Sequence, residues 1–308
     1  MNNSTLQRIF LSSASDVCVF LKRDDLLHPQ IQGNKWRKLA PFMLPLATKN
    51  TGILSFGGAF SNHLHALATA GKLFGIPTIG IVRGSAVNIE NPTLSHARRC
   101  GMQIFPVTKV LYDLLKKADL SSVLSTIGIH SSDPFVLLPE GGDTVEALLG
   151  CTAITAEIQQ QLPKDVGRQL YYCVPAGTGC TAAGVIAGAG LTGKTLVFPA
   201  AKYGVEHSTI MEKLTAAGYG NEVDFEIIEH NLPIKFAEMT IELQAFIEKF
   251  EQQEGILLDP IYTSKMMFTL CNMLEHHFFP PGSTVVALHT GGLQGWDGMY
   301  KHPFIQVQ

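Results

Sequence analysis

The most informative stretch of the sequence is a glycine-rich turn, Val174-Pro175-Ala176-Gly177-Thr178-Gly179-Cys180-Thr181. It follows an apolar segment at 170–174 that is typical of a buried strand, and it leads into a segment at 180–190 that predicts a tightly packed helix rich in Ala and Gly. Glycines between a strand and a helix let backbone N–H groups approach an anion, and the two threonine hydroxyls add donors. The turn has neither the G-x-G-x-x-G pattern of dinucleotide-binding proteins nor the Gly-Lys-Ser/Thr ending of a P-loop. A single phosphate monoester fits it best, and the alternative is a turn that binds no ligand.

A second stretch places a lysine at the start of a helical pattern, Gln32-Gly33-Asn34-Lys35-Trp36-Arg37-Lys38-Leu39. Apolar residues recur every three or four positions from Trp36 to Leu46, which predicts a helix with one buried face. A lysine that forms a Schiff base needs a desolvated site or nearby cations that lower its pKa, and Arg37 and Lys38 are close in sequence. A solvated surface lysine is an equally acceptable interpretation of the spacing alone. Together, however, an amine that can hold an aldehyde and a loop that can hold a phosphate suggest pyridoxal phosphate (PLP).

Length and composition describe an ordinary globular protein. The 308 residues suggest roughly two domains, at about 150 residues each. A net charge of −3 gives no electrostatic argument for binding nucleic acid or an anionic membrane, and no apolar run approaches the ~18 residues of a spanning helix. The N-terminal sequence does not resemble a secretion signal, and the six cysteines include no C-x-x-C pair. We therefore expect a cytoplasmic location.

Short apolar segments alternate with helical patterns along the chain. Strands are expected at 17–21, 52–56, 78–82, 103–107, 135–138, 170–174, 195–198 and 284–288, and two of the longer helices at 109–125 and 237–252. This alternation predicts an α/β architecture of open, mainly parallel sheets flanked by helices. Glycine-rich and polar clusters follow four of the strands, at 57–63, 139–143, 175–181 and 289–295. Because ligands of parallel sheets bind where loops leave the carboxyl ends of strands, these clusters are candidates for lining one cleft.

The cluster at 57–63 ends in Ser61-Asn62-His63, and Ser61 and Asn62 are good N-cap residues for a following helix. His63 and His65 are two positions apart. On a helix that spacing turns the two imidazoles to different faces, so the pair is a poor metal site. We predict no metal.

In combination, these segments resemble the 1-aminocyclopropane-1-carboxylate deaminase and D-cysteine desulfhydrase family of PLP enzymes. The matching segments occur in the family's order and cover most of the chain: 22–25, 33–39, 57–63, 139–142, 258–265 and 289–292. The resemblance implies the two-domain PLP fold type II, which is like the tryptophan synthase β subunit. It implies a large PLP-binding domain at 1–40 and 145–308, a small α/β domain at 41–144, and a homodimer.

The resemblance also implies roles for individual residues. Lys35 would hold the cofactor covalently, Asn62 would bond its phenolic oxygen, and Thr290 would meet its pyridine nitrogen. Ser61 would lie beside the carboxylate or amine of the substrate, and Tyr262 would lie against the ring. The phosphate would be held by Ala176, Gly177, Thr178, Gly179, Cys180 and Thr181.

Two threonines direct the expected reaction. In deaminases of the cyclopropane amino acid, the resemblance implies a glutamate at the position of Thr263 and a leucine at the position of Thr290. With threonine at both positions, this chain looks more like the desulfhydrases. A neutral hydroxyl does not keep the pyridine nitrogen protonated, which makes PLP a weaker electron sink and favours loss of a good β leaving group. The expected reaction converts D-cysteine to pyruvate, ammonia and sulfide, with the freed Lys35 as the base.

Other functions stay open at this point. Deamination of 1-aminocyclopropane-1-carboxylate is one alternative, and elimination from a hydroxy amino acid such as serine is another. Many relatives carry a tyrosine after a glycine where this chain has His-Asn-Leu-Pro-Ile-Lys at 230–235, so a PLP-binding protein with lost or changed activity is a third. The remaining alternative is a protein that binds no PLP and serves only as a structural partner of other proteins. The occurrence of all these motifs together in one chain argues against it.

Overall fold

The structure is a computed structural model that describes residues 3–11, 16–28, 30–31, 33–130, 133–167, 169–201, 204–220, 222–229 and 237–299. The described part separates into two compact units. The first unit comprises Met1–Asn34 and Leu148–Leu293, and the second comprises Lys35–Ala147 and the described residues from Gln294 onward. Residues 230–235, where the family's tyrosine is missing from the sequence, lie outside the described residues.

The first unit is built on a six-stranded sheet with the order β1-β2-β10-β7-β8-β9. All neighbouring strands are parallel except β1, which pairs antiparallel with β2. The central strand β10 pairs with the N-terminal β2 on one side and with β7 on the other, so both ends of the chain contribute to one sheet. The strands are β1 (Leu6–Ile9), β2 (Cys18–Arg23), β7 (Leu170–Ala176), β8 (Lys194–Pro199), β9 (Phe225–Ile227) and β10 (Thr284–His289).

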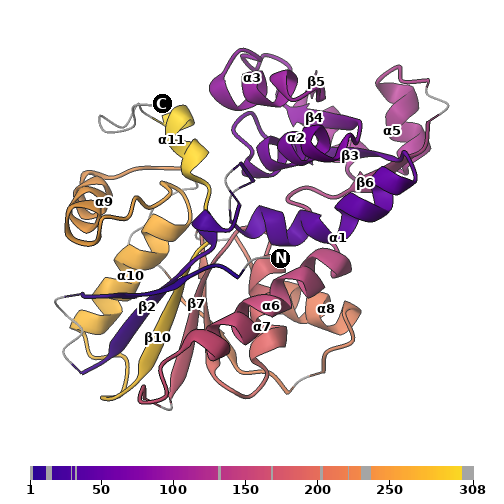
Figure 1. Cartoon of the computed structure of the whole chain (residues 1–308). Coiled ribbons are helices and arrows are strands. Elements are labelled where there is room, and N and C mark those ends of the chain that lie inside the picture. The colour runs from indigo at the N-terminus through magenta and orange to yellow at the C-terminus, as the bar shows by residue number, and fades with distance from the viewer. Residues whose placement is uncertain are drawn as a thin grey trace. The chain divides into compact units, whose positions relative to one another are not determined.

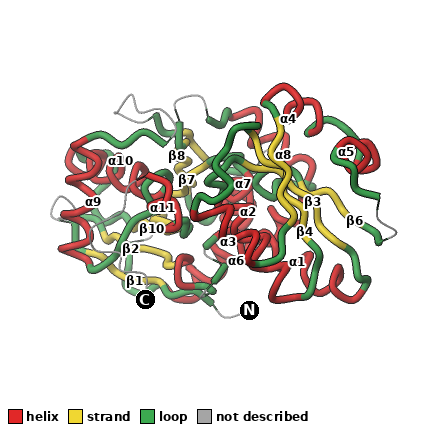
Figure 2. Tube along the Cα trace, turned by 90° about the horizontal axis from the view of Figure 1, so that it is seen from above, coloured by secondary structure: helices red, strands yellow, loops and turns green. Residues whose placement is uncertain are grey.

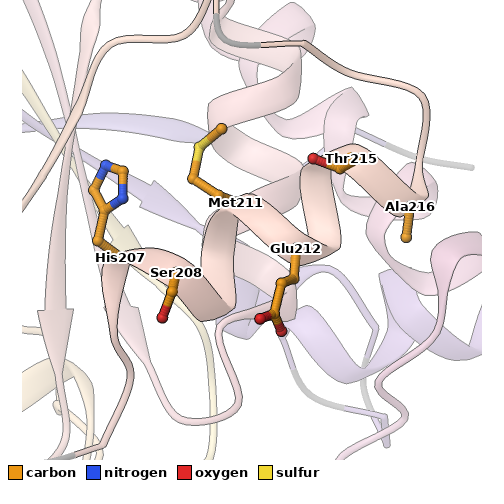
Figure 3. Close-up of a pocket in the computed structure, with 6 residues that line it drawn as sticks. All are labelled: His207, Ser208, Met211, Glu212, Thr215 and Ala216. Atoms are coloured by element: carbon orange, nitrogen blue, oxygen red, sulfur yellow. The ribbon is translucent and has the colours of Figure 1, made fainter.

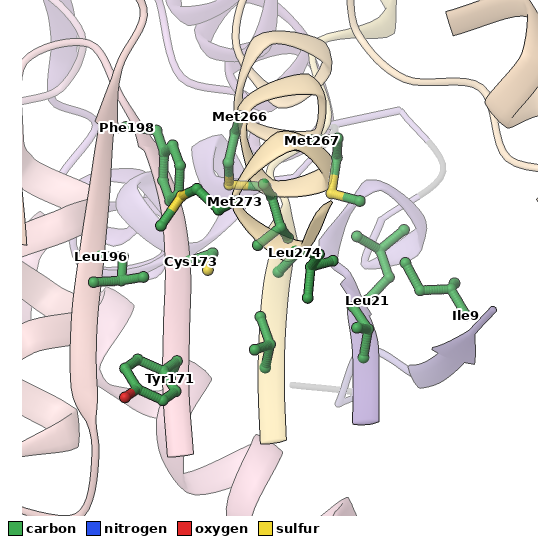
Figure 4. Close-up of a cluster of buried hydrophobic side chains, with 14 of the residues drawn as sticks. Ile9, Leu21, Tyr171, Cys173, Leu196, Phe198, Met266, Met267, Met273 and Leu274 are labelled. Atoms are coloured by element: carbon green, nitrogen blue, oxygen red, sulfur yellow. The ribbon is translucent and has the colours of Figure 1, made fainter. Parts of the chain in front are cut away.

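Helices cover both faces of this sheet (Figure 1). One face carries α6 (Val145–Gln161), α7 (Cys180–Ala189) and α8 (His207–Ala216). The other carries α9 (Ile241–Glu254) and α10 (Thr263–Glu275). Methionine, leucine and phenylalanine side chains of these two helices fill the core against β2, β7, β8 and β10, as Figure 4 shows for α10. The short 3-10 helix η1 (Asp24–Leu26) follows β2.

The second unit has a four-stranded, fully parallel sheet with the order β5-β4-β3-β6. Helices α2 and α3 lie on one side of it, and α4 and α5 lie on the other (Figure 2). The elements are α1 (Asn34–Thr48), β3 (Gly52–Gly57), α2 (Asn62–Phe74), β4 (Thr78–Arg83), α3 (Pro92–Arg99), β5 (Gln103–Val107), α4 (Lys109–Leu115), α5 (Leu120–Thr126), β6 (Phe135–Leu138), η2 (Leu293–Gly295) and α11 (Trp296–Met299).

The segment from Gln294 to 299 groups with the second unit, whereas the sequence-based division assigned it to the large domain. Its contacts explain the grouping. The hydroxyl of Thr93 on α3 donates to Oε1 of Gln294 (2.6 Å), and Gly298 lies so close to Phe60 that an added Cβ would be 2.5 Å from the ring.

The predicted α/β architecture with mainly parallel sheets is confirmed, and the differences concern boundaries. The helix expected at 109–125 is two helices, because Asp119 caps α5 by accepting from the Ser122 N–H (2.9 Å). The helix expected from 237 begins at 241, because Ala237 has φ 60° and Thr240 forms the cap. The edge strands β1 and β9 were not predicted. None of the helices in the described ranges has the length and apolar character needed to cross a membrane.

Gly33 fixes where α1 begins relative to the end of β10. Its φ of +61° lies in the left-handed region that favours glycine, and a Cβ there would stand 1.7 Å from the carbonyl oxygen of Thr290. The next residue, Asn34, donates its backbone N–H to that same oxygen (3.2 Å). The chain therefore turns directly over the carboxyl end of β10 before the lysine helix starts.

We predict that Gly33→Ala lowers the free energy of unfolding by at least about 2 kcal/mol more than Gly255→Ala does. Gly255, in the same unit, has φ +67° but no heavy atom within 4 Å of its Cβ position, so it carries the same backbone strain without the collision. Urea unfolding of the two variants measures the difference. Equal destabilisation would show that the close approach to Thr290 is relieved at no cost.

Candidate functional site

The glycine loop, residues 176–181, joins the end of β7 to the start of α7. Gly179 is the N-cap of α7 with φ +85°, and no side chain among the described residues caps this helix. The first backbone bond of the helix is donated by Ala183 to the Gly179 carbonyl (2.8 Å). N–H groups in the first turn of a helix have no partner within that helix, and the helix dipole favours an anion there. The loop is therefore suited to hold a phosphate.

Thr181 links the glycine loop to the residue before the candidate lysine. The side-chain amide of Asn34 donates from Nδ2 to Oγ1 of Thr181 (2.8 Å). An amide nitrogen only donates, so the Thr181 hydroxyl accepts here and keeps its own proton for a different acceptor. Thr181 is buried, and a donor hydroxyl beside the uncapped helix suits the same anion.

Tyr262 is held over the glycine loop by the turn that begins α10. The carboxylate of Asp259, fully buried, accepts from the backbone N–H groups of Ile261, Tyr262 and Thr263 at 3.1, 2.8 and 2.7 Å. A Cβ on Gly177 would lie 3.2 Å from the ring of Tyr262. Glycine at 177 therefore lets the tyrosine ring approach the loop closely.

The end of β10 places Thr290, which is buried, beside a neutral histidine. His289 accepts from the Gly291 N–H at Nδ1 (3.2 Å), so its proton is on Nε2, which donates to the Leu257 carbonyl (2.8 Å). The 4.0 Å contact between His289 and Asp25 is therefore not an ion pair; Asp25 is bound instead by Arg23 (2.7 Å).

Two buried hydroxyls at the start of α10 have no hydrogen-bond partner in the described part of the chain. They belong to Thr263 and Ser264, both fully buried. An unsatisfied hydroxyl in the interior costs about 1–3 kcal/mol. Such atoms fit a site that is completed by a polar ligand.

In the second unit, Ser61 and Asn62 begin α2 at the carboxyl end of β3. The Ser61 hydroxyl caps the helix by accepting from the Leu64 N–H (3.2 Å), as its sequence predicts. Asn62 is the first helical residue, and its side chain is half-buried. Ser61, Asn62 and Lys35 thus belong to one unit, while the glycine loop, Tyr262 and Thr290 belong to the other.

His63 is buried as a neutral imidazole of one defined tautomer. The Ser55 hydroxyl donates to the Leu138 carbonyl (2.8 Å), so the 2.8 Å contact between Ser55 Oγ and His63 Nε2 requires a proton on Nε2. Nδ1 is then an acceptor, and it has no partner among the described residues. Burial, followed by the charges of Lys35 and Lys38, lowers the pKa of His63 to about 3.

Lys38 is a functional candidate that the sequence analysis considered only as a neighbour of Lys35. Its side chain is buried, and its Nζ donates to the carbonyl of Gly141 (3.0 Å). No acidic side chain in the described residues forms an ion pair with it. A buried ammonium without a counter-charge is costly, so its position fits an anionic ligand. The sequence signal that could have identified Lys38 is its spacing, because a residue three positions after Lys35 on a helix lies on the same face as Lys35.

A separate open depression of about 730 Å³ lies along α8 and contains no predicted site residue (Figure 3). Every residue that lines it lies on this helix: His207, Ser208, Met211, Glu212, Thr215 and Ala216. The ring of His207 stacks on Phe225 with centroids 4.4 Å apart. Within the described ranges, no group of three or more His, Cys, Asp or Glu side chains is arranged to hold a metal ion.

Comparison with known proteins identifies relatives whose sequences align with almost the whole length of this chain. A family model described as pyridoxal-phosphate dependent enzyme matches residues 4–291. A bifunctional D-cysteine desulfhydrase/1-aminocyclopropane-1-carboxylate deaminase of Arabidopsis thaliana is 27% identical over 90% of this chain and 73% of its own length. A D-cysteine desulfhydrase of Yersinia enterocolitica is 26% identical over 89% and 86%. The crystal structure of a homologue of 1-aminocyclopropane-1-carboxylate (ACC) deaminase has the same fold, with a TM-score of 0.78 and 24% identity over 96% of this chain and 91% of that one.

We predict that His63 makes the free energy of unfolding depend on pH. Between pH 6.5 and about 3 the unfolded chain protonates this histidine and the folded chain does not, so stability falls as pH falls through that window. Its contribution amounts to about 2 kcal/mol between pH 7 and pH 5. Urea unfolding at both pH values should show that His63→Gln, which can still donate to Ser55, loses this part of the dependence. If the free energy of unfolding of His63→Gln differs between the two pH values as much as that of wild type, the buried neutral state of His63 is contradicted.

Proposed function

Because the chain belongs to the family of pyridoxal-phosphate dependent enzymes, we propose that it is a lyase of small amino acids that eliminates sulfide from D-cysteine. The products are pyruvate, ammonia and sulfide. The names of its relatives support the class of reaction. The observation that carries the choice of D-cysteine is the pair of buried threonine hydroxyls, Thr263 and Thr290, where deaminases of the cyclopropane amino acid are expected to have glutamate and leucine.

The residues present fit the cofactor. The uncapped start of α7 and the Thr181 hydroxyl provide donors for its phosphate, and Lys38 provides a buried positive charge for an anionic group. Lys35 would hold it covalently, and Tyr262 would lie against its ring. When bound, PLP supplies an electron sink for the α carbon of the substrate.

The ring nitrogen meets a hydroxyl in this proposal and not a carboxylate. Two carboxylates near these threonines are engaged elsewhere. Asp25, which lies 4.0 Å from His289, binds Arg23, and Asp259, four residues before Thr263, accepts three backbone N–H groups. A hydroxyl does not stabilise a positive charge on the ring nitrogen as a carboxylate does. The electron sink is then modest, which suits a substrate whose β substituent leaves readily.

Three residues of this chain act on the substrate. Lys35 would serve as the base that takes the proton from the α carbon. The start of α2, with Ser61 beside it, binds the substrate carboxylate, because a helix N-terminus favours an anion. Tyr262 would cover the bound substrate and limit access of water during proton removal. The proton removed at the α carbon and the departing thiolate account for the elimination of hydrogen sulfide. One water molecule then hydrolyses the released 2-aminoacrylate to pyruvate and ammonia, which balances the reaction.

Deamination of 1-aminocyclopropane-1-carboxylate is the second candidate. The Arabidopsis thaliana relative, named for both activities, is the specific observation in its favour. The threonines at 263 and 290 argue against it, because opening the cyclopropane ring without a leaving group asks more of the electron sink. The family resemblance also supports a cytoplasmic location and a homodimer. Sedimentation of the purified protein tests the oligomeric state.

We predict that Lys35→Ala lowers kcat for sulfide release from D-cysteine by about 10³-fold or more. Lys49→Ala, an exposed lysine just after the same helix, serves as the matched control and should leave the rate unchanged. Sulfide, pyruvate and ammonia are measured for D-cysteine, L-cysteine, D-serine and 1-aminocyclopropane-1-carboxylate. Turnover of the cyclopropane amino acid alone would favour the second candidate. A wild type that binds PLP and turns over none of these contradicts the proposed reaction, and one that binds no PLP contradicts the proposal as a whole.

We predict opposite effects of Lys38→Met on the two forms of the protein. Affinity for PLP should fall by about tenfold or more, because a hydrogen bond to a charged group contributes about 1.5–3 kcal/mol. The PLP-free protein should be as stable as wild type or more stable, because a buried, unpaired charge has been removed. Fluorescence titration with PLP and thermal unfolding measure the two effects. Loss of stability with unchanged affinity would assign Lys38 a purely structural role.

A further inference from the structure

Three side chains of the second unit form a hydrogen-bonded chain that ends at Asn62. Gln294, in the 3-10 helix η2, donates from Nε2 to Oδ1 of Asn62 and to the carbonyl oxygen of Phe60 (3.3 Å). Its Oε1 accepts from the hydroxyl of Thr93 (2.6 Å), which is 1% exposed. Gln294 lies in the polar cluster at 289–295, but nothing in the sequence links it to Thr93, because the two residues are about 200 positions apart.

The chemistry of these groups fixes the orientation of each amide. A backbone carbonyl only accepts, so the end of Gln294 that faces Phe60 must be its NH₂ group. The same NH₂ group faces Asn62, so the Asn62 atom on that side must be its oxygen. The other end of Gln294 is then its oxygen, and Thr93 is the donor to it. The orientations of both amides and the donor role of Thr93 therefore all follow from the fact that the Phe60 carbonyl can only accept.

The consequence is that Nδ2 of Asn62 points away from Gln294. Nδ2 donates no hydrogen bond within the described part of the chain, and the side chain is only half-buried. Asn62 therefore offers a fixed N–H donor to a ligand. An asparagine without such a partner presents either its oxygen or its nitrogen, since the two orientations have the same shape.

We propose that Gln294, backed by Thr93, is a positioning residue that holds the Asn62 amide with its N–H toward the phenolic oxygen of PLP. This inference rests on the proposed function, in which Asn62 meets that oxygen. In the opposite orientation the amide oxygen would face the phenolic oxygen, and two acceptors would repel. Gln294 thus selects the one orientation of Asn62 that stabilises the phenolate.

The surrounding packing supports this role. Gln294 begins the segment that crosses Phe60, where Gly298 approaches the ring too closely for any side chain. Trp296 in the same segment is buried. Because the backbone on both sides of the Gln294–Asn62 bond is packed, the glutamine is held in place before any ligand arrives.

The test compares Gln294→Glu, Gln294→Met, Asn62→Ala and the double variant Asn62→Ala/Gln294→Glu. PLP is titrated into each protein after removal of the cofactor, and the dissociation constant is followed by fluorescence. The pH at which the visible absorbance of the bound cofactor titrates is the second readout. Gln159→Glu is the matched control, because that glutamine, among the described residues, bonds the hydroxyls of Thr192 and Tyr172 in the first unit.

We expect Gln294→Glu to weaken PLP binding about tenfold or more, because a carboxylate only accepts and turns the Asn62 oxygen toward the cofactor. The absorbance should titrate at higher pH, because a phenolate without its donor holds the shared proton more tightly. Gln294→Met should weaken binding only about twofold, since Asn62 then samples both orientations. Gln159→Glu should match wild type.

The double variant separates positioning from a structural role. If Gln294 acts through Asn62, adding Gln294→Glu to Asn62→Ala has no further effect on PLP affinity or on the titration. A further loss in the double variant, or a Met variant as weak as the Glu variant, would overturn the inference. Unchanged PLP binding in Asn62→Ala would overturn it as well, while leaving the proposed function intact. Absence of PLP binding in wild type would instead reject the proposed function.

Discussion

The turn at Gly33 is the constraint on which the candidate site depends. Its left-handed backbone lets the chain pass over the Thr290 carbonyl, and Asn34 then bonds both that carbonyl and Thr181. The end of β10, the glycine loop and the start of α1 are thereby held together through backbone and short side-chain contacts. Lys35, the residue proposed to bind the cofactor, is the next residue along the chain. The start of its helix is therefore set by a glycine that no other residue can replace without moving the backbone.

Each of the two units keeps polar groups that do not serve its own folding. Within the described ranges, the start of α7 in the first unit has no side-chain cap, and the buried hydroxyls of Thr263 and Ser264 have no partner. In the second unit, the buried cation Lys38 has no ion pair with a described carboxylate. Each of these features lowers the stability of the protein without its ligand. Departures of this kind from the rules of folding are expected at functional sites, and a phosphorylated, polar cofactor of the family answers all of them.

Much of this arrangement follows from local sequence, and the remainder depends on contacts that local sequence does not contain. Strand and helix periodicity predicts the parallel sheets, and the glycine turn predicts the uncapped helix, because both signals lie within a few neighbouring residues. The start of α9 was placed too early because Ala237 adopts φ 60° against its helical preference. Gln294 and Thr93 could not be found from sequence, since their meaning comes from a contact between distant segments. The tautomer of His63 likewise depends on which carbonyl Ser55 donates to.

The most direct test of the central claim is to locate the covalent bond to PLP. The purified protein with PLP is reduced with borohydride, digested and examined by mass spectrometry for the peptide that carries the cofactor. We expect modification at Lys35, with Lys38 and Lys265 unmodified. Modification at either of those other lysines, or at none, would contradict the assignment of the site to the helix that follows Gly33.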